Sequence, residues 1–490
     1  MSTLLIVLLA LPLVAGAVAI VRPNRVGEAA TLLAGIACFG LTIALALSVR
    51  HGAERHTLGS WLHLDALGAV FLLATGLLYG AGAIFSIGYL RAGGSERAGY
   101  LNYARRYYAL FNLFGWTMLL VPLMNDFATL WVAIELTTIV SVLLVALDRT
   151  DAALEAAWKY VLIASVGLGI ALLGVIVLYA AGTTALGDSY LPRFGRYLAV
   201  GDQLHAVPVQ FAFLLAVVGF GTKVGFAPLH TWLPDAHSEA PSPVSALLSG
   251  ALLANAFYAI LRFYQVTALA GGDSFPRHVL LVFGTLSLLV AGLFVLRQEN
   301  YKRLLAYSTI EHMGVIALGI GFGVQIAVAG ALLHVLNHAA AKGLAFFGSG
   351  SLLRRYDTKE IESIRGAAST LPLSGPMFLA AALALGGLPV SGIFRSEFQI
   401  VSGGFEKPAY VWVTLLLVFV NLAFFGVIWN AGRMVLTPAA APAARGETSW
   451  WMVAAMGACL IVVIGLGFHL PTDLASLLRQ ATMSLSGAGG

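Results

Sequence analysis

Cysteine and charge are both scarce in this chain of 490 residues. The two cysteines, Cys38 and Cys459, fall in separate apolar segments, so they support neither a disulfide framework nor a metal site. Charged residues make up only 10% of the sequence, which is far below the share in a soluble domain. The sequence also lacks a nucleotide-binding loop, a set of cluster-ligating cysteines, a haem-attachment motif and a nucleophile elbow. We therefore expect this chain to bind no cofactor.

Apolar sequence, in contrast, is abundant. Hydrophobic residues make up 59% of the chain and the mean hydropathy is +0.88, which predicts an all-α polytopic membrane protein. Residues 1–490 are interpreted as a single transmembrane domain with about 14 segments long enough to cross a bilayer. The segments are expected near residues 3–20, 28–49, 65–90, 106–124, 126–147, 156–180, 210–236, 242–265, 278–297, 303–323, 325–351, 371–405, 410–435 and 451–470.

Two of these segments contain helix-breaking residues in their interior. One is expected to break at residues 225–228 and again at Pro234, and the other at residues 386–392. Broken backbone at membrane depth is tolerated only where it lines a cavity or is buried in protein. The two breaks therefore indicate a functional centre inside the bilayer.

The spacing of acidic and basic residues predicts an internal repeat. Glu135 precedes Lys223 by 88 residues and Glu311 precedes Glu397 by 86, and in each pair the second member lies in a broken segment. A five-segment unit is odd, so its two copies must insert with opposite orientation, as in transporters with inverted repeats. The two five-helix repeats are expected over residues 106–265 and 278–435.

The distribution of basic residues predicts the orientation. Although the sequence pI is 9.2, the Lys and Arg residues lie in short loops beside the segments, so we expect no nucleic-acid partner. With both termini outside, seventeen of them fall on the inner side and eight on the outer side, as the positive-inside rule requires. No Lys or Arg precedes the first apolar run, so that run is interpreted as a retained helix and not a signal peptide.

Ionisable residues nevertheless occur inside these apolar segments or at their breaks. The insertion free energy of a lysine at bilayer depth is unfavourable by about 2.5–3.5 kcal/mol, so such a lysine is expected where it has a partner, faces a cavity or serves a function. The residues that share this property are Glu135, Lys223, Glu311, His334, His338, Lys342, Arg395 and Glu397. Together they predict a proton or ion path.

Glu135 and Lys223 are the expected centre of the first half of this path. They form either a pump pair or a structural ion pair, and either pair would be titratable. Lys159 forms a local ion pair with Glu155 one turn away, or faces the path and couples to Glu135. A further polar group is expected to form an entrance from the inner side, and it contains His230, Asp235, His237 and Glu239.

His334, His338 and Lys342 recur every four residues and so share one helical face. Imidazoles titrate near working pH, which favours a proton relay. The alternative is an intramembrane metalloenzyme with zinc on the two histidines. The sequence does not favour this alternative, because it lacks the glutamate of a His-Glu-x-x-His motif and because the lysine one turn away would repel a cation. Glu311 and His312 could lie near the inner interface, and Arg395 and Glu397 could form an interfacial pair.

Two runs of residues resemble a known family. Residues 223–250, beginning Lys-Val-Gly-Phe-Ala-Pro-Leu-His, resemble the signature of the antiporter-like membrane subunits of respiratory complex I, Mrp cation/proton antiporters and energy-converting NiFe hydrogenases. Residues 302–314 resemble a second block of that family. The Ile-Glu-His-Met-Gly sequence at residues 310–314 is most similar to the hydrogenase-4 component F branch. The resemblance extends from about residue 60 to residue 435.

This resemblance implies a role for each matching residue. Glu135 matches the family's fifth-span glutamate and Lys223 its broken-helix lysine. Glu397 matches the residue at the end of the second broken helix. The central relay corresponds to His334, His338 and Lys342. The chain departs from the family where many members carry a lysine or histidine, because Ala254 and Asn255 stand there. The link between Lys223 and the relay would then run through Asn255 and water, or through Glu311 and His312.

The implied function is proton translocation by one subunit of a redox-driven complex of the hydrogenase-4 or NADH:quinone oxidoreductase type. Such a subunit has no redox chemistry of its own. Its expected partners are other membrane subunits, lipid and H⁺ or Na⁺, in the inner membrane of a bacterial or archaeal cell. The alternative is a cation/proton antiporter or an inorganic-carbon uptake subunit, which would use the same path without electron transfer.

Overall fold

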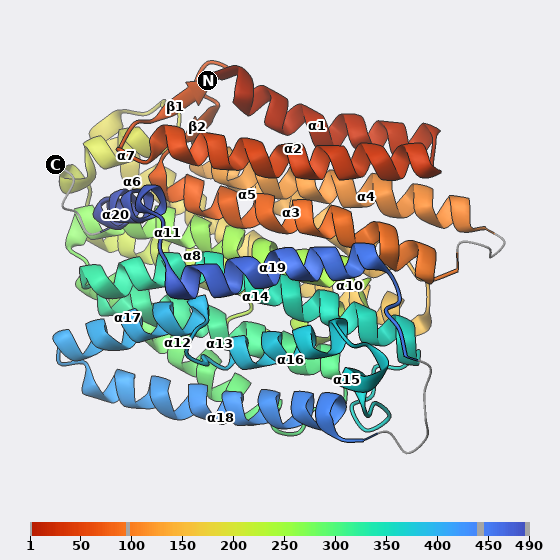
Figure 1. Cartoon of the computed structure of the whole chain (residues 1–490). Helices are drawn as coiled ribbons and strands as arrows, with labels where there is room; N and C mark the ends of the chain where they lie inside the picture. The colour runs from red at the N-terminus through yellow and green to blue at the C-terminus, as the bar shows by residue number, and fades with distance from the viewer. Residues whose placement is uncertain (1, 95–98, 439–444, 486–490) are drawn as a thin grey trace.

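The computed structural model describes residues 2–94, 99–438 and 445–485, and these residues are almost entirely helical (Figure 1). The first half contains α1 (Ser2–Val21), α2 (Arg25–Val49), α3 (Ala66–Ala92), α4 (Tyr100–Leu120), η1 (Val121–Leu123), α5 (Phe127–Val145), α6 (Asp151–Leu186), α7 (Phe194–Ala199), η2 (Gly201–Gln203), α8 (Ala206–Val224), α9 (Leu233–Glu239), α10 (Ser242–Leu247), the π-helical segment η3 (Leu248–Leu252) and α11 (Leu253–Gly271). The second half contains α12 (Ser274–Val295), α13 (Tyr301–Phe322), α14 (Gln325–Tyr356), α15 (Ala367–Thr370), α16 (Ser374–Leu385), α17 (Gly392–Glu406), α18 (Tyr410–Leu436), α19 (Trp450–Phe468) and α20 (Thr472–Leu485).

Eleven helices in the described ranges are long and apolar enough to cross a membrane. The helices α4 and α14 and the α16–α17 pair occupy the other three segments expected from the sequence. The all-helical polytopic fold is therefore confirmed, and the number of fourteen crossings stays a prediction. The short helices α7, α15 and α20 were not expected, and neither was the antiparallel hairpin that β1 (Arg55–Thr57) and β2 (Leu62–Leu64) form between α2 and α3.

Both predicted breaks are present, with one correction. The helix α8 ends at Val224, and Gly225 then adopts a φ of +83°, a conformation that glycine reaches without strain. The second break that we expected at Pro234 is wrong. Pro234 lies in the first turn of α9, where a proline fits because its missing N–H would have no helical partner. In the second half, α16 ends at Leu385 and α17 begins at Gly392.

Polar caps fix where several helices begin. Asp126 accepts a hydrogen bond from the Thr129 amide at the start of α5, over 2.8 Å. Asn300 accepts from the amides of residues 302 and 303 at the start of α13. Such caps satisfy amides that have no partner inside the helix, which stabilises these helix starts.

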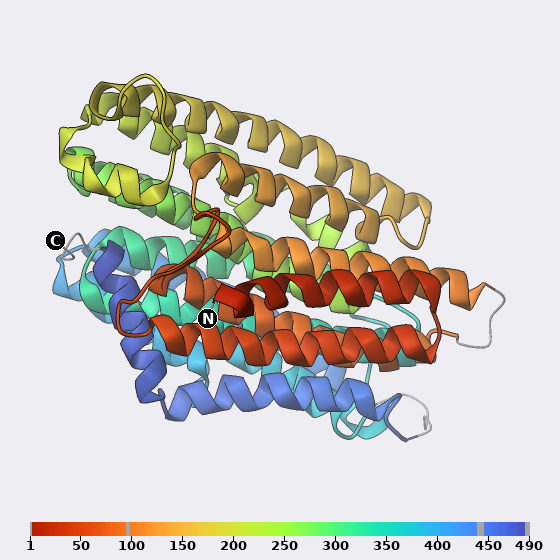
Figure 2. The same ribbon diagram turned by 90° about the horizontal axis from the view of Figure 1, so that it is seen from above.

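The long helices run roughly parallel in one bundle, and α14 lies in its interior (Figures 1 and 2). Residues 327 to 352 of α14 are buried almost without interruption, against α3, α13, α16, α17 and α19. The hairpin, α7 and α20 lie at the same end of the bundle (Figure 1), and α20 runs across the other helices there (Figure 2). This packing places the histidines and the lysine of α14 in the core of the protein.

Candidate functional site

Lys223 lies in the last turn of α8 and is fully buried. Its Nζ donates hydrogen bonds to Thr138 Oγ1 and, over 3.5 Å, to the Ile134 carbonyl, both on α5. The Tyr160 ring of α6 lies beneath the ammonium group, with its centroid 5.6 Å from Nζ. Among the described residues, no carboxylate lies within ion-pair distance of this ammonium group. A hydroxyl, a carbonyl and an aromatic face therefore replace water around it.

Glu135 follows Ile134 on α5 and is half-buried. Its Oε2 is buried and has no hydrogen-bond partner in the part of the chain that the structure describes. The predicted pairing with Lys223 is therefore not a direct ion pair, because the lysine is held by the hydroxyl and the carbonyl instead. The two groups are close neighbours in the fold, and each has capacity for a further partner.

Lys342 on α14 repeats this arrangement in the second half of the chain. It is fully buried, and its Nζ donates to Ser308 Oγ and, over 2.9 Å, to the Leu305 carbonyl, both on α13. Glu311 follows Ser308 by three residues, and its buried Oε1 has no hydrogen-bond partner within the described ranges. Each buried lysine is thus held by a hydroxyl and a carbonyl of a neighbouring helix, on which a carboxylate lies within one turn.

Three histidines gather between α13, α14 and α17. His312 Nδ1 lies 3.0 Å from His334 Nε2, and His334 Nδ1 lies 2.9 Å from Ser396 Oγ. Glu397 reaches this group from α17, with its Oε1 3.9 Å from His312 Nδ1. The His338 ring centroid is 5.2 Å from that of His312. The predicted relay residues of α14 are therefore brought together, with His312 inserted between them.

His338 differs from the other two histidines. Neither of its ring nitrogens has a hydrogen-bond partner among the described residues, although the side chain is fully buried. Buried polar groups in proteins are nearly always hydrogen-bonded, to protein or to ordered water. A water molecule at this position would satisfy the ring and would connect it to its neighbours.

The second break allows the helices to approach this group closely. A Cβ at Gly392 would lie 2.2 Å from Asn337 Oδ1, and a Cβ at Gly387 would lie 2.5 Å from Glu397 Oε2. Asn337 Nδ2 donates to the Gly392 carbonyl over 2.5 Å. The glycines of the break are therefore what lets α17 bring Glu397 to the histidines.

The remaining predicted residues lie around this centre. Lys159 forms its ion pairs with Glu155 and, at 3.6 Å, with Asp235, which Arg303 also contacts at 2.8 Å. None of these pairs involves Glu135. Of the two alternatives for Lys159, the structure therefore has the local ion pair with Glu155. His230 is buried in the break after α8, with its ring 6.4 Å from that of Tyr307.

Asn255 and Arg395 do not join the centre directly. Asn255 Nδ2 donates to the Met118 carbonyl over 2.9 Å and to Thr75 Oγ1 over 3.4 Å, and it has no hydrogen bond with Lys223 or the histidines. Arg395 is partly exposed and forms no ion pair with Glu397 in the described ranges, because residues two apart point to different sides of a helix.

Some features of the site escaped the sequence analysis. Lys302, which we expected in an inner loop, is fully buried and donates to the Ala240 carbonyl over 2.5 Å. His237, which we expected in the entrance from the inner side, is also fully buried, with Nδ1 2.9 Å from the Leu233 carbonyl. The π-helical segment η3 packs Gly250 against Ala339, next to His338. Lys302 stands between Tyr301 and Arg303, so its sequence neighbours do not indicate its burial, and no sequence signal indicates the π-helical turn.

The two histidines proposed for the zinc alternative do not converge as ligands. The buried set whose ligand atoms lie within 4.8 Å of one another is His312, His334 and Glu397, without His338. A metalloenzyme centre on His334 and His338 would therefore need a different arrangement of α14.

The family model described as NADH:quinone oxidoreductase/Mrp antiporter, TM, matches residues 124–426 of this chain. The chain belongs to this family. Among its curated relatives, the hydrogenase-4 component F homolog of Methylacidiphilum infernorum is 35% identical over 352 residues, or 71% of this chain and 74% of the relative. The NADH-quinone oxidoreductase subunit N of Desulforudis audaxviator is 34% identical over 346 residues, which are 70% of this chain and 67% of the relative.

Solved structures of similar shape confirm the fold. A chain of the membrane-bound sulfane sulfur reductase, an archaeal respiratory membrane complex, superposes with a TM-score of 0.86 at 22% identity and covers 99% of this chain and 98% of its own length. A chain of respiratory complex I from Thermus thermophilus superposes with a TM-score of 0.83 at 23% identity, and the match covers 99% of this chain and 100% of that one. A chain of the Mrp complex from Dietzia superposes with a TM-score of 0.85 at 21% identity, and the match covers 100% of this chain and 98% of that one. This member of the antiporter-like family is therefore a polytopic integral membrane protein.

Proposed function

We propose that this subunit moves protons across the membrane through its buried lysines, histidines and carboxylates. The observation that carries the proposal is that Lys223 and Lys342 are both fully buried, and that no carboxylate of the described residues lies at ion-pair distance from either. Leaving a lysine in the bilayer interior costs about 2.5–3.5 kcal/mol on insertion scales, so two such residues call for a function. A lysine bound by neutral groups can release its proton more readily than one bound directly by a carboxylate.

The arrangement supports a sequence of transfers. The ion-paired group of Lys159, Asp235 and Arg303 lies where α6, α9 and α13 meet, and it is the proposed entrance. Lys223 with Glu135 is the first exchange site, and Lys342 with Glu311 is the second.

The histidine group links this second site to Glu397. A cavity of about 810 Å³ lies beyond it, lined by Leu333, Gln399 and Arg479, and it offers an outlet at the end where α20 lies. Gln399 follows Ser396, the partner of His334, by three residues and so lies on the same side of α17, which brings the cavity next to the relay.

The names of the relatives suggest the setting. One is called a homolog of a hydrogenase-4 component and another a subunit of NADH-quinone oxidoreductase. We propose that this chain likewise works beside other membrane subunits of a redox-driven complex, that electron transfer takes place in those partners, and that this chain binds no redox cofactor. The proposed location is the inner membrane of a bacterial or archaeal cell, with both termini outside.

The proposal is tested by proton flux in sealed membrane vesicles that contain the complete complex. Electron donors should drive acidification when the parent subunit is present and not when Lys342→Ala replaces it, with assembly of the complex unchanged. Equal flux in the variant would contradict the proposal. If flux instead required Na⁺ and no electron donor, the chain would work as a cation/proton antiporter.

A further inference from the structure

A second set of potential metal ligands lies far from the buried lysines, on the hairpin between α2 and α3. Its members are Glu54, His56 and His63, and their ligand atoms all lie within 4.8 Å of one another. His56 and His63 are direct cross-strand partners in the antiparallel pair of β1 and β2. Side chains at such positions lie on the same face of a sheet, so both imidazoles are presented to one point.

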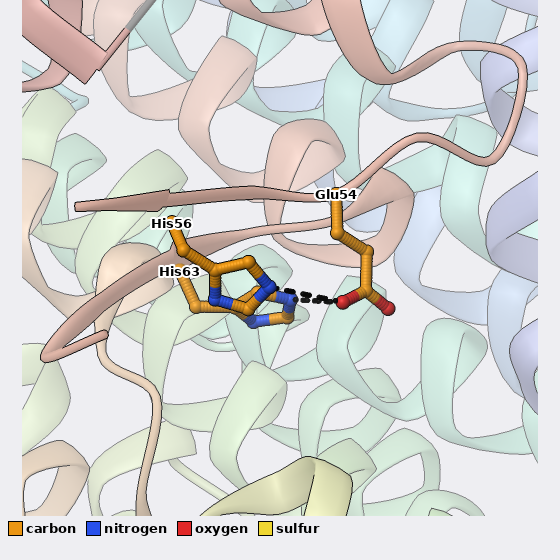
Figure 3. Close-up of side chains that lie close together, drawn as sticks. All are labelled: Glu54, His56 and His63. Atoms are coloured by element: carbon orange, nitrogen blue, oxygen red, sulfur yellow. Dashed lines mark hydrogen bonds and ion pairs between the residues drawn. The ribbon is translucent and has the colours of Figure 1, made fainter. Parts of the chain in front are cut away.

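The geometry at that point is specific. His56 Nε2 and His63 Nε2 each lie 3.3 Å from the same carboxylate oxygen, Oε2 of Glu54. The two rings are stacked, with centroids 4.7 Å apart and planes inclined by 25°. Figure 3 shows the carboxylate of Glu54 pointing at the tips of both rings. Ligands bound to a tetrahedral Zn²⁺ at 2.0–2.1 Å are about 3.3 Å from one another, which is the separation between each imidazole nitrogen and the carboxylate oxygen here.

Hydrogen bonding alone explains this arrangement less well. N–H···O hydrogen bonds are usually 2.7–3.2 Å long, and both distances exceed that range. His63 is 6% exposed, and its Nδ1 has no hydrogen-bond partner among the described residues. The polar contact of the His63 ring is therefore the one between its Nε2 and Glu54 Oε2.

The hairpin that carries these ligands is anchored to the rest of the protein. Leu62 forms a β-bridge with Met124, and Asn125 Nδ2 donates to the Ser60 carbonyl over 2.7 Å. Arg55, between two of the ligands in sequence, turns away and donates to the Ser48 carbonyl over 2.9 Å. The ligands are therefore pre-positioned, and the nearest arginine in sequence is directed away from the point where they converge.

We propose that Glu54, His56 and His63 form a binding site for Zn²⁺ with three protein ligands and a fourth position open to water. Two imidazoles and a carboxylate are a ligand set that zinc accepts in proteins. The side chains of Glu54 and His56 are 57% and 43% exposed, which leaves access for the ion and for the water ligand. The site is independent of the proposed proton path, because none of its residues belongs to that path.

The experiment is Zn²⁺ binding by the purified full-length protein in detergent, measured by equilibrium dialysis with elemental analysis. The parent should bind one ion at this site, and Glu54→Gln or His56→Gln should weaken that binding by about 100-fold or more. Both residues are exposed, so their loss empties no core position. The matched control is His51→Gln, which removes a nearby exposed histidine outside the ligand set and should bind like the parent.

A further variant separates this site from the buried ligand set. His334→Gln removes a member of the group formed with His312 and Glu397, and it should leave the hairpin binding intact. Cobalt(II) in place of zinc should give the visible absorption of a tetrahedral ion in the parent and in His334→Gln, but not in Glu54→Gln. The proposal is overturned if the parent binds no zinc, if both hairpin variants bind like the parent, or if binding is lost in His334→Gln instead.

Discussion

His312 on α13 and His334 on α14 face each other across the helix interface, with 3.0 Å between Nδ1 and Nε2. One of these nitrogens must carry the proton and the other must accept it, because two N–H groups or two lone pairs would repel at this distance. His334 continues the chain to Ser396 at 2.9 Å. A proton that arrives at one end of this chain can therefore be released at the other, if a further group accepts it.

His338 can exchange protons with this pair through water, since its ring centroid lies 5.2 Å from that of His312. His338→Gln keeps a polar side chain of similar reach but removes the titratable nitrogen. Positioned proton-transfer groups contribute about 10²–10⁴-fold to rates, so we expect the glutamine variant to slow proton flux in vesicles substantially while the complex still assembles. His338→Leu should also exclude water from the site and should reduce the flux further.

A purely structural His338 would give a different result. It would be held by hydrogen bonds, whereas neither ring nitrogen has a partner in the described part of the chain. In that case the glutamine variant would transport normally and only the leucine variant would fail, through lost assembly. Normal flux in His338→Gln would remove this residue from the mechanism.

Lys223 and Glu135 should both be required for transport. We expect Lys223→Ala and Glu135→Ala to abolish most proton flux without loss of membrane insertion. Lys223→Arg should also fail, because a guanidinium stays protonated and cannot cycle. The matched control is Lys407→Ala, in the turn between α17 and α18, which should transport like the parent. Flux at the parental rate in either alanine variant would show that the residue is dispensable.

The class of fold and the central residues could be predicted because they follow from local rules. Long apolar runs predict spanning helices, and charged residues inside them stand out by their cost. The four-residue spacing placed His334, His338 and Lys342 on one face of a helix, and all three are buried together on α14. The glycines at residues 386 and 392 indicated the break before α17 in the same way.

The remaining features depend on contacts between distant segments, which one sequence does not contain. Thr138 and Ser308 are ordinary helix residues until the fold brings a lysine to each of them. We predicted a helix break at Pro234 because proline disfavours helix interiors, yet Pro234 lies in the first turn of α9, where it is tolerated. The hairpin was missed because its strands have three residues each, too few to show a period of two.

Cysteine labelling should establish the orientation. Ser363 is exposed in the connection between α14 and α16, and Ser189 is exposed between α6 and α7 at the opposite end. A membrane-impermeant reagent added to intact cells should label Ser189→Cys and not Ser363→Cys. The native cysteines, Cys38 and Cys459, are both buried and should contribute little background. The opposite labelling pattern would invert the proposed topology.

The ion pair of Arg262 and Asp65 should stabilise the end of the bundle that carries the hairpin. The two side chains are 2% and 17% exposed, with 2.7 Å between Nη2 and Oδ1. Asp65→Ala leaves a buried arginine without its partner, which typically costs about 3–5 kcal/mol of unfolding free energy. It also removes the cap on the Gly68 amide. Asp473→Ala breaks an exposed pair with Arg50 and should cost about 1 kcal/mol or less, as thermal unfolding in detergent would measure.

This pair also predicts a pH dependence. Burial is the largest single influence and opposes ionisation of Asp65, but the charges of Arg262 and His63, with the hydrogen bonds from Arg262 and the Gly68 amide, together outweigh it and hold the pKa of Asp65 below its ordinary value. A depressed carboxylate pKa stabilises the folded state above the pKa of the unfolded chain, about 3.9 for aspartate. The stability difference between the parent and Asp65→Asn should therefore be constant near neutral pH and should shrink only as the pH falls below about 4. A difference that shrinks between pH 8 and 6 would contradict this assignment.

The glycine at the start of α17 should be essential for transport because of what it contacts. A Cβ at Gly392 would lie 2.2 Å from Asn337 Oδ1, so Gly392→Ala must displace Asn337 or move α17 away from α14. Either change separates Glu397 and Ser396 from the histidines, and we expect proton flux to fall although all ionisable residues remain. Gly432→Ala in α18 is the matched control, since nothing lies within 4 Å of its added Cβ, and a helical alanine should stabilise by about 0.5–1 kcal/mol. If Gly392→Ala transports like Gly432→Ala, close packing of the second break is not needed for the path.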